Sequence, residues 1–434
     1  MDFTNDPSRC SWVTSAQDHA DFPLQNLPFG VFQPNEGDAR IGLAIGDCIL
    51  DLSAAASYFE GLAFTAAQAC SRGDLAVLME LGDAARVALR QAASDLLDAA
   101  SDVGKRAQVG AAALLHHQAD CSMQLPTRIG DYTDFYAGIE HARNCGKLFR
   151  PDAPLLPNYC YVPIGYHGRA STICVSGTQV RRPGGQFKRM NESIPAFGPT
   201  ERLDYEVELA MWIGKRNAMG EPVTIAQARS VVWGFGLLND WSARDIQAWE
   251  YQPLGPFLGK SFATTVSPWV VTPEALAPFY APLFVRNEGE PEPLPYLTDA
   301  SDLASGGLDL ELEVSLASAS MRSQGIAPMT LGRVNARHLY WTFAQLVAHQ
   351  TSNGCALSIG DLFGTGTISG TTHESCGSLL EVSVGGTQAL TLPDGESRTF
   401  LADGDEVVIR AYCARDGFAR IGFGECRAVV MSAA

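Results

Sequence analysis

Acidic residues at alternating positions mark the segment RLDYEVELAMWIG (residues 202–214). Asp204, Glu206 and Glu208 occupy every second position, and the residues between them and after them are mostly apolar. This alternation predicts a half-buried β-strand, because successive side chains of a strand point to opposite faces. Glu206 and Glu208 then project together, about 7 Å apart along the backbone. Carboxylates this close either face bulk water or bind a hard divalent cation through oxygen, and the segment alone supports both interpretations.

Two further segments could supply carboxylates to such a cation. LLNDWSARDIQ (residues 237–247) places Asp240 beside an apolar run, where an unpaired carboxylate is costly. GDYTDFYAGIEHARN (residues 130–144) contributes Asp131, Asp134 and His141 within Gly- and Tyr-rich sequence that is typical of a functional loop.

An all-carboxylate site would form if four of these acids came together: Asp134, Glu206, Glu208 and Asp240. Oxygen ligands suit Mg²⁺ or Ca²⁺ and disfavour Zn²⁺. Four carboxylates overcharge one divalent ion, so a basic neighbour is expected, and the candidates are Arg244 and Lys260.

Long motifs in the same region resemble the fumarylacetoacetase family, also called the fumarylacetoacetate hydrolase family. The motifs are GDYTDFY (130–136), VPIGYHGRAS (162–171), DYEVELAMWIG (204–214), NDWSARDIQAWEYQPLGPFLGKSF (239–262) and GTISG (366–370). The resemblance runs from about 120 to 430, and the N-terminal third matches only in general layout. It implies metal-dependent hydrolysis of a C–C bond in 4-fumarylacetoacetate. The products would be fumarate and acetoacetate, in the last step of tyrosine and phenylalanine catabolism.

The resemblance also implies roles for individual residues. The metal site of the family maps to six positions: Asp134, Glu206, Glu208, Asp240, Lys260 and Thr264. Asp204 lies outside this set and is expected to be structural. His141 is implied as the proton acceptor, oriented by Glu381, since an ordinary histidine pKa near 6.5 allows it to take a proton at neutral pH. Three side chains are implied to stabilise developing negative charge: Arg244, Gln247 and Lys260.

Substrate contacts are implied at seven positions: Tyr136, Arg150, Tyr166, Gln247, Tyr251, Gly366 and Thr367. Arg150 suits a substrate carboxylate because a guanidinium can hold it bidentately. Tyr166 could instead belong to the core. The expected partners are a small dicarboxylate diketone and a second copy of the chain in a homodimer.

Two other functions fit the same acids. One is a different member of the superfamily, an acylpyruvate hydrolase or an oxaloacetate decarboxylase. The other is a metal-stabilised binding or scaffolding protein, in which the acids only tie β-sheets together.

Composition narrows the class of protein. The 434 residues are 46% hydrophobic and 18% charged, which is typical of a globular chain. The formal net charge of −17 disfavours nucleic acid and anionic membranes as partners. The 11 cysteines lack CxxC spacing, and the N-terminus resembles no signal peptide. The longest apolar runs fall far short of the ~20 residues that span a bilayer. We therefore expect a cytoplasmic protein.

Local patterns indicate how the chain is organised. Residues 41–52 predict a hairpin joined by Gly46 and Asp47. Residues 83–100 predict a helix with one apolar stripe: Leu89, Ala92, Ala93, Leu96, Leu97 and Ala100. Asn335 could cap a helix that buries Leu339, Phe343, Leu346 and Val347. Frequent turns after residue 379 predict a β-rich C-terminal half.

These patterns and the resemblance together predict an α+β fold that is mainly β. A small N-terminal SH3-like barrel with a helical connection is expected over residues 1–120. A layered mixed β-sheet of the fumarylacetoacetase type is expected over residues 121–434.

Overall fold

A seven-stranded mixed sheet is the centre of the computed structural model, which describes residues 1–434 except the side chain of Phe149. Its strand order is β7-β6-β22-β13-β14-β16-β8. The β6–β22 and β8–β16 pairs are parallel and the other pairs are antiparallel. The strands are β6 (Tyr132–Phe135), β7 (Gly165–His167), β8 (Ile173–Val175), β13 (Val207–Ile213), β14 (Val232–Asp240), β16 (Thr264–Val266) and β22 (Leu362–Gly364).

Strand β13 is buried on both faces, so the predicted half-buried strand is wrong in this respect. Leu209, Met211 and Ile213 belong to one hydrophobic core, and Ala210 and Trp212 belong to another. The second core is shared with the N-terminal part of the chain. A second layer of protein therefore covers the face that the local pattern assigned to solvent.

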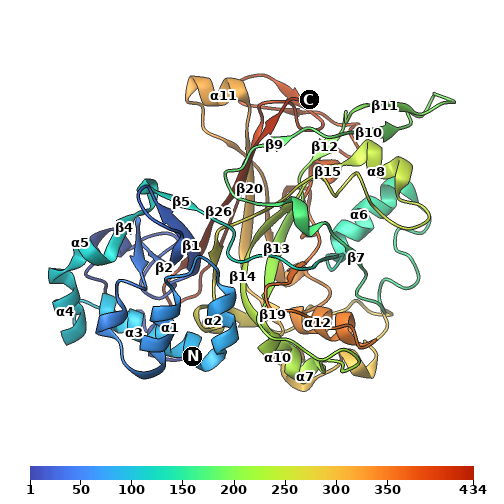
Figure 1. Ribbon diagram of the computed structural model, residues 1–434. Helices are drawn as coiled ribbons and strands as arrows, with labels where there is room; N and C mark the ends of the chain where they lie inside the picture. The colour runs from blue at the N-terminus through green and yellow to red at the C-terminus, as the bar shows by residue number, and fades with distance from the viewer.

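A five-stranded sheet packs beside the central sheet through β26, which contacts β14 and β16 (Figure 1). Its order is β21-β20-β25-β26-β9. The strands are β9 (Val180–Arg181), β20 (Glu311–Ala317), β21 (Met329–Asn335), β25 (Glu406–Cys413) and β26 (Ile421–Met431). Strand β25 covers the segment EVVIRAYC, and the β-rich C-terminal half is confirmed.

The N-terminal unit is a six-stranded antiparallel sheet with helices, and it lies on one side of the larger body (Figure 1). Its strands are β1 (Phe29–Pro34), β2 (Arg40–Ile45), β3 (Cys48–Asp51), β4 (Leu115–His117), β5 (Cys121–Met123) and β17 (Trp269–Val270). Its helices are α1 (Gly61–Ala69), α2 (Ala76–Leu81), α3 (Asp83–Leu97), α4 (Asp102–Val109) and α5 (Ala111–Leu114). Strand β17 comes from far along the chain and ties the two parts together. The SH3-like character and the boundary at residue 120 stay predictions.

Two local predictions can be compared with this unit. The hairpin over 41–52 is confirmed by β2 and β3, which pair from Gly42–Asp51 to Ile45–Cys48. The helix over 83–100 is shorter than predicted, because the backbone becomes extended at Asp98 and α3 ends at Leu97. Ala100 therefore lies outside the helix and is exposed.

The remaining helices lie in the part of the chain that follows the N-terminal unit. They are α6 (Ile139–Phe149), α7 (Ile225–Ala228), α8 (Arg244–Glu250), α9 (Pro273–Leu276), α10 (Ala300–Ser305), α11 (Ala319–Gln324), α12 (Phe343–Thr351) and α13 (Leu379–Val382). Asn335 caps only the short 3₁₀ helix Ala336–His338, and α12 begins later with Thr342 as its cap. No helix in the described part of the chain combines the length and apolarity needed to cross a membrane.

Four two-stranded ladders complete the β-structure. They are β10 (Gly184–Phe187) with β11 (Ala196–Pro199), β12 (Leu203–Asp204) with β15 (Ser242–Ala243), β18 (Tyr280–Ala281) with β19 (Gly307–Leu308), and β23 (Leu390–Thr391) with β24 (Ser397–Arg398). The β10–β11 hairpin projects from the body (Figure 1). Short 3₁₀ helices connect many elements; they are Phe3–Asn5, Thr14–Ala16, Ala56–Tyr58, Gln118–Asp120, Ala170–Thr172, Arg229–Val231, Ala277–Phe279, Pro295–Leu297, Ala336–His338 and His373–Ser375.

Candidate active site

Four buried carboxylates meet where neighbouring strands of the central sheet end. Asp134 lies on β6, Glu208 on β13 and Asp240 at the end of β14, while Glu206 just precedes β13. One oxygen from each lies within 4.8 Å of those of the other three. All four side chains are buried, so the interpretation in which the strand acids face bulk water is wrong.

The carboxylates and one apolar core lie on the same face of the central sheet. Glu208 has the same orientation as Ala210 and Trp212 further along β13, and those two residues pack against the N-terminal unit. Asp240 likewise continues the side of β14 that carries Leu238. The N-terminal unit thus covers one end of this face, and the carboxylates occupy the other end.

Gly364 makes room for two of these carboxylates. A Cβ atom at this position would lie 2.5 Å from Asp134 Oδ1 and 2.9 Å from Glu208 Oε2. Strand β22 runs between β6 and β13, so a side chain here would separate the two acids. The Gly366 amide, on the segment that follows, donates to Glu208 Oε2 at 3.0 Å.

Two buried cations balance part of the negative charge. Lys260 Nζ donates to Glu206 Oε2 at 2.5 Å and to Asp240 Oδ2 at 2.9 Å. Arg244 Nη1 lies 2.7 Å from Glu206 Oε1. Asp240 also accepts from Tyr166 Oη at 2.8 Å and from the hydroxyl of Thr264 at 3.2 Å.

Lys260 and Arg244 form ion pairs with neither Asp134 nor Glu208, so no cation in the described part of the chain balances the negative charge of these two acids. Burial and the neighbouring carboxylates raise the pKa of Asp134 and of Glu208 well above the ordinary values. Burial also opposes ionisation of Glu206, but Lys260 and Arg244 outweigh it and hold the pKa of Glu206 well below its ordinary value. Asp134 Oδ1 and Glu208 Oε1 are buried without a hydrogen-bond partner among the described residues. This all-oxygen cluster fits a divalent metal site.

His141 lies beside the cluster on α6 and is paired with a second acid. Its Nδ1 lies 2.7 Å from Glu381 Oε2, and its Nε2 lies 3.9 Å from Glu206 Oε1. With Glu381 accepting the Nδ1 proton, Nε2 is the nitrogen available to exchange protons on the metal side. Burial lowers the pKa of His141, but Cys145 and Glu381 outweigh burial and raise it well above 6.5.

A cavity of about 710 Å³ opens onto these groups. Twelve of the predicted site residues line it: Asp134, Tyr136, His141, Arg150, Tyr166, Glu206, Arg244, Gln247, Tyr251, Lys260, Gly366 and Thr367. Of the other four, Glu208, Asp240 and Glu381 contact residues of the lining, and Thr264 contacts Asp240. The structure therefore brings all of the predicted positions together, while their individual roles stay predictions.

The predicted substrate contacts lie at different depths. Tyr136 stands edge-on to the His141 ring, with 5.5 Å between ring centroids. Thr367 Oγ1 is buried and has no hydrogen-bond partner among the described residues. Arg150 and Tyr251 are exposed and lie on the outer part of the lining.

Comparison with known proteins identifies the family. The model for the C-terminal part of fumarylacetoacetate hydrolases matches residues 132–431, and the model for the N-terminal part of fumarylacetoacetases matches residues 25–126. The chain belongs to the fumarylacetoacetase family of hydrolases. The fumarylacetoacetase of Rattus norvegicus is 45% identical over 426 residues, which cover 98% of this chain and 99% of the rat chain. That of Homo sapiens is 45% identical over 428 residues, with the same coverage of both chains.

A solved structure shares the fold of this family member. The crystal structure of Cg1458 with an inhibitor matches with a TM-score of 0.50 and 14% sequence identity, and it covers 94% of this chain and all of Cg1458. This match concerns the fold alone.

Several residues that support the family site were missed from the sequence. Glu381 Oε2 accepts from the hydroxyls of Ser369 and Ser378, and its Oε1 accepts from Asn144 Nδ2 at 2.9 Å. Cys145 Sγ lies 3.5 Å from His141 Nε2. Residues 130–144 have the composition of a functional loop, but they form β6 and the first part of α6. The predicted candidate Asp131 is exposed and lies outside the cluster. Helical spacing from His141 would have indicated Asn144 and Cys145.

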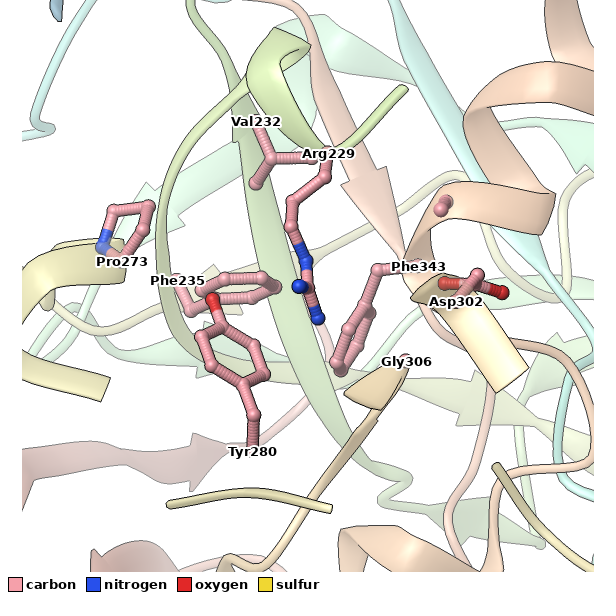
Figure 2. A pocket seen from close by; sticks show the side chains of 9 residues that line it. Arg229, Val232, Phe235, Pro273, Tyr280, Asp302, Gly306 and Phe343 are labelled. Carbon is pink, nitrogen blue, oxygen red and sulfur yellow. The ribbon is translucent and has the colours of Figure 1, made fainter. Parts of the chain in front are cut away.

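A second cavity lies apart from this family site, beside β14 and α12 (Figure 2). Its volume of about 20 Å³ is enough for about one water molecule. The Arg229 side chain reaches between Tyr280 and Phe343, and its guanidinium lies 4.4 Å from the Tyr280 ring centroid. This cavity is too small for an organic substrate.

Proposed function

We propose that the protein hydrolyses the C–C bond of 4-fumarylacetoacetate and releases fumarate and acetoacetate. One observation carries the proposal. The His141–Glu381 pair presents Nε2 to a large cavity directly beside four buried carboxylates. A base and a metal site side by side are what hydrolysis of a β-diketone requires. The relatives named fumarylacetoacetase that cover nearly the whole chain support this substrate.

The metal ligands in this proposal are Asp134, Glu206, Glu208 and Asp240, with Lys260 and Thr264 beside them. A bound divalent ion would polarise the diketone oxygens, stabilise the leaving enolate and lower the pKa of His141 toward that of a neutral base. Mg²⁺ and Ca²⁺ both suit the ligand set, and cellular abundance favours Mg²⁺ during turnover.

His141 accepts a proton from the attacking water through Nε2 and later returns it to the leaving carbon. Glu381 keeps the Nδ1 proton in place and stabilises the imidazolium that forms between these two steps. Asn144, Ser369 and Ser378 donate to Glu381, so its charge and orientation are maintained while His141 changes protonation state.

Arg244, Gln247 and Lys260 stabilise the negative charge that develops on the substrate oxygens. Lys260 uses two of its three N–H donors on Glu206 and Asp240, which leaves one for the substrate. Arg244 lies 3.2 Å from Gln247 Oε1, and this contact directs the Gln247 amide nitrogen away from the arginine.

Binding of the substrate carboxylates uses the outer lining of the cavity. Arg150 is the basic group suited to the distal carboxylate, with a hydroxyl donor from Tyr251. Tyr136 offers its hydroxyl deeper in the cavity, beside His141. The deeper contacts come from Tyr166, Gly366 and Thr367. The hydroxyl of Thr367 is the donor that still lacks a partner.

The assembly and location expected from the sequence form part of the proposal. A homodimer is supported by apolar side chains exposed on the projecting β10–β11 hairpin, where Phe197 is 80% exposed. Sedimentation of the purified protein measures this state directly. A cytoplasmic location is supported by the eleven free cysteines.

The reaction is tested by incubating the purified protein with fumarylacetoacetate and Mg²⁺. Loss of the diketone's ultraviolet absorbance is followed, and the products are identified by chromatography. We expect fumarate and acetoacetate in equal amounts. Preferred turnover of an acylpyruvate or of oxaloacetate in parallel reactions would contradict the proposed substrate.

A further inference from the structure

Asp204 makes contacts that connect two separate parts of the candidate active site. It lies on β12 and is 0% exposed. Its Oδ2 accepts from Arg244 Nε at 2.9 Å and also lies 2.8 Å from Arg244 Nη2. These contacts fix the guanidinium so that its remaining nitrogen, Nη1, reaches Glu206 at 2.7 Å.

The same carboxylate holds the short helix that carries Glu381. Asp204 Oδ1 accepts from the Leu379 amide at 2.7 Å, and Oδ2 accepts from the Leu380 amide at 3.0 Å. Leu379 and Leu380 are the first two residues of α13, and Glu381 is the third. A shift of this helix would therefore change the 2.7 Å contact between Glu381 and His141.

We propose that Asp204 is a positioning residue, which sets Arg244 and Glu381 relative to each other and to the metal site. The proposal rests on the proposed function for the roles of Arg244 and Glu381. It goes beyond the structural role expected for Asp204 from the sequence. Because one carboxylate binds both groups, it fixes the position of the His141–Glu381 pair relative to Arg244.

The donors around Asp204 explain why only a carboxylate suits this position. Oδ1 accepts two backbone N–H groups, from Tyr205 and Leu379, and Oδ2 accepts from Leu380 and Arg244. An asparagine would place its own NH₂ group against one of these two pairs of donors, whichever way its amide is turned. The substitution Asp204→Asn therefore keeps the size of the side chain and disrupts the contacts.

Asp405 offers a matched control outside the cavity. It is also 0% exposed and pairs with an arginine, Arg398, through Nε at 2.8 Å and Nη2 at 2.9 Å. It also accepts a backbone N–H group, from Ala402 at 2.8 Å. Asp405→Asn removes the same kind of buried contact without touching Arg244 or α13.

The experiment compares kcat, KM and thermal stability of the wild type, Asp204→Asn and Asp405→Asn, with fumarylacetoacetate and saturating Mg²⁺. Both variants should lose thermal stability. Only Asp204→Asn should lower kcat, by about 100-fold, with KM changed by less than about threefold, because it disturbs groups that act in the transition state. Asp204→Ser, which leaves space for water, replaces Asp204→Asn if that variant does not fold.

Each outcome has a distinct meaning. A kcat for the Asp204 variant within about twofold of the Asp405→Asn value would overturn the positioning role. Failure of the wild type and Asp405→Asn to turn over the substrate would instead overturn the proposed function. Loss of kcat confined to the Asp204 variant supports both.

Discussion

Glu206 has the most contacts with charged groups in the candidate site. Lys260 and Arg244 bind its two oxygens, and His141 lies 3.9 Å away. Its low pKa and the raised pKa of Glu208 show that identical side chains two positions apart experience opposite surroundings. The cations stabilise Glu206 as an anion, whereas Glu208 and Asp134 require additional positive charge. A bound divalent ion would supply that charge.

His141→Asn tests the assignment of the base. The substitution removes the Nε2 that accepts the proton but keeps a polar side chain beside Glu381. We expect kcat to fall by about 10²- to 10⁴-fold, which is the usual contribution of a general base. Mg²⁺ affinity, measured by calorimetry, should not fall, because the proposal assigns His141 as the base and not as a ligand. His349→Asn on α12 is the control, and unchanged turnover by His141→Asn would refute the assignment.

The sequence predicted the acids of the site but not the side chains that hydrogen-bond to Glu381. Alternation in residues 202–214 indicated Glu206 and Glu208, and an acid beside an apolar run indicated Asp240. Glu381 lies 240 residues from His141, so no local pattern connects them. Its role came from resemblance, and its contacts with Ser369, Ser378 and Asn144 depend on tertiary packing.

At the scale of elements, the site depends on strands that deliver carboxylates to one end of a sheet. Asp134 on β6 pairs with Gly364 on β22, and Gly364 in turn pairs with Ala210 on β13. A residue without a side chain at this position lets the acids of β6 and β13 approach each other. The burial of β13 on both faces could not be predicted locally, because the covering layer comes from the N-terminal unit.

Gly364→Ala tests this arrangement. The added methyl group would lie 2.5 Å from Asp134 Oδ1, so the carboxylate has to move. We expect Mg²⁺ affinity to fall by at least about 10-fold, as when other groups that orient metal ligands are changed. Calorimetric titration measures this loss. In contrast, Gly198→Ala on β11 should bind normally, because its Cβ would lie 3.9 Å from the nearest atom. Equal affinities for the two variants would contradict the role of Gly364.

At the scale of the whole molecule, the fold holds several like charges together at a cost to its stability. Frequent turns after residue 379 predicted the β-rich half correctly, and the hairpin over 41–52 was also predicted. The packing of the N-terminal unit on the central sheet, with β17 added to its own sheet, was not readable from local patterns. That packing buries the face from which the carboxylates project.

The metal-free protein should therefore lose stability as the pH rises. The pKa values of Asp134 and Glu208 are raised, so the folded state retains protons that the unfolded state has released, and the free energy of unfolding falls with increasing pH. His141 acts in the same direction because its pKa is raised by folding. Its contribution to stability is fully present below pH 6.5 and is lost as the pH rises from there through the raised pKa.

Urea unfolding in a chelator at pH 6, 7 and 8 measures this effect. We expect the free energy of unfolding to fall by about 1–2 kcal/mol across the range. Saturating Mg²⁺ should remove most of the loss, because the ion displaces the protons and stabilises the carboxylates. A metal-free protein that becomes more stable from pH 6 to 8 would show that the acids are balanced in another way.

The most direct test of the whole account is a titration of Mg²⁺ into metal-stripped protein while turnover of fumarylacetoacetate and metal binding are both followed. We predict negligible turnover without metal, and turnover that rises in proportion to the occupied sites. Glu208→Gln should shift both curves together to higher Mg²⁺ concentrations. Full turnover by the metal-free protein, or turnover that does not follow occupancy, would contradict the claim that the buried carboxylates hold the metal used in hydrolysis.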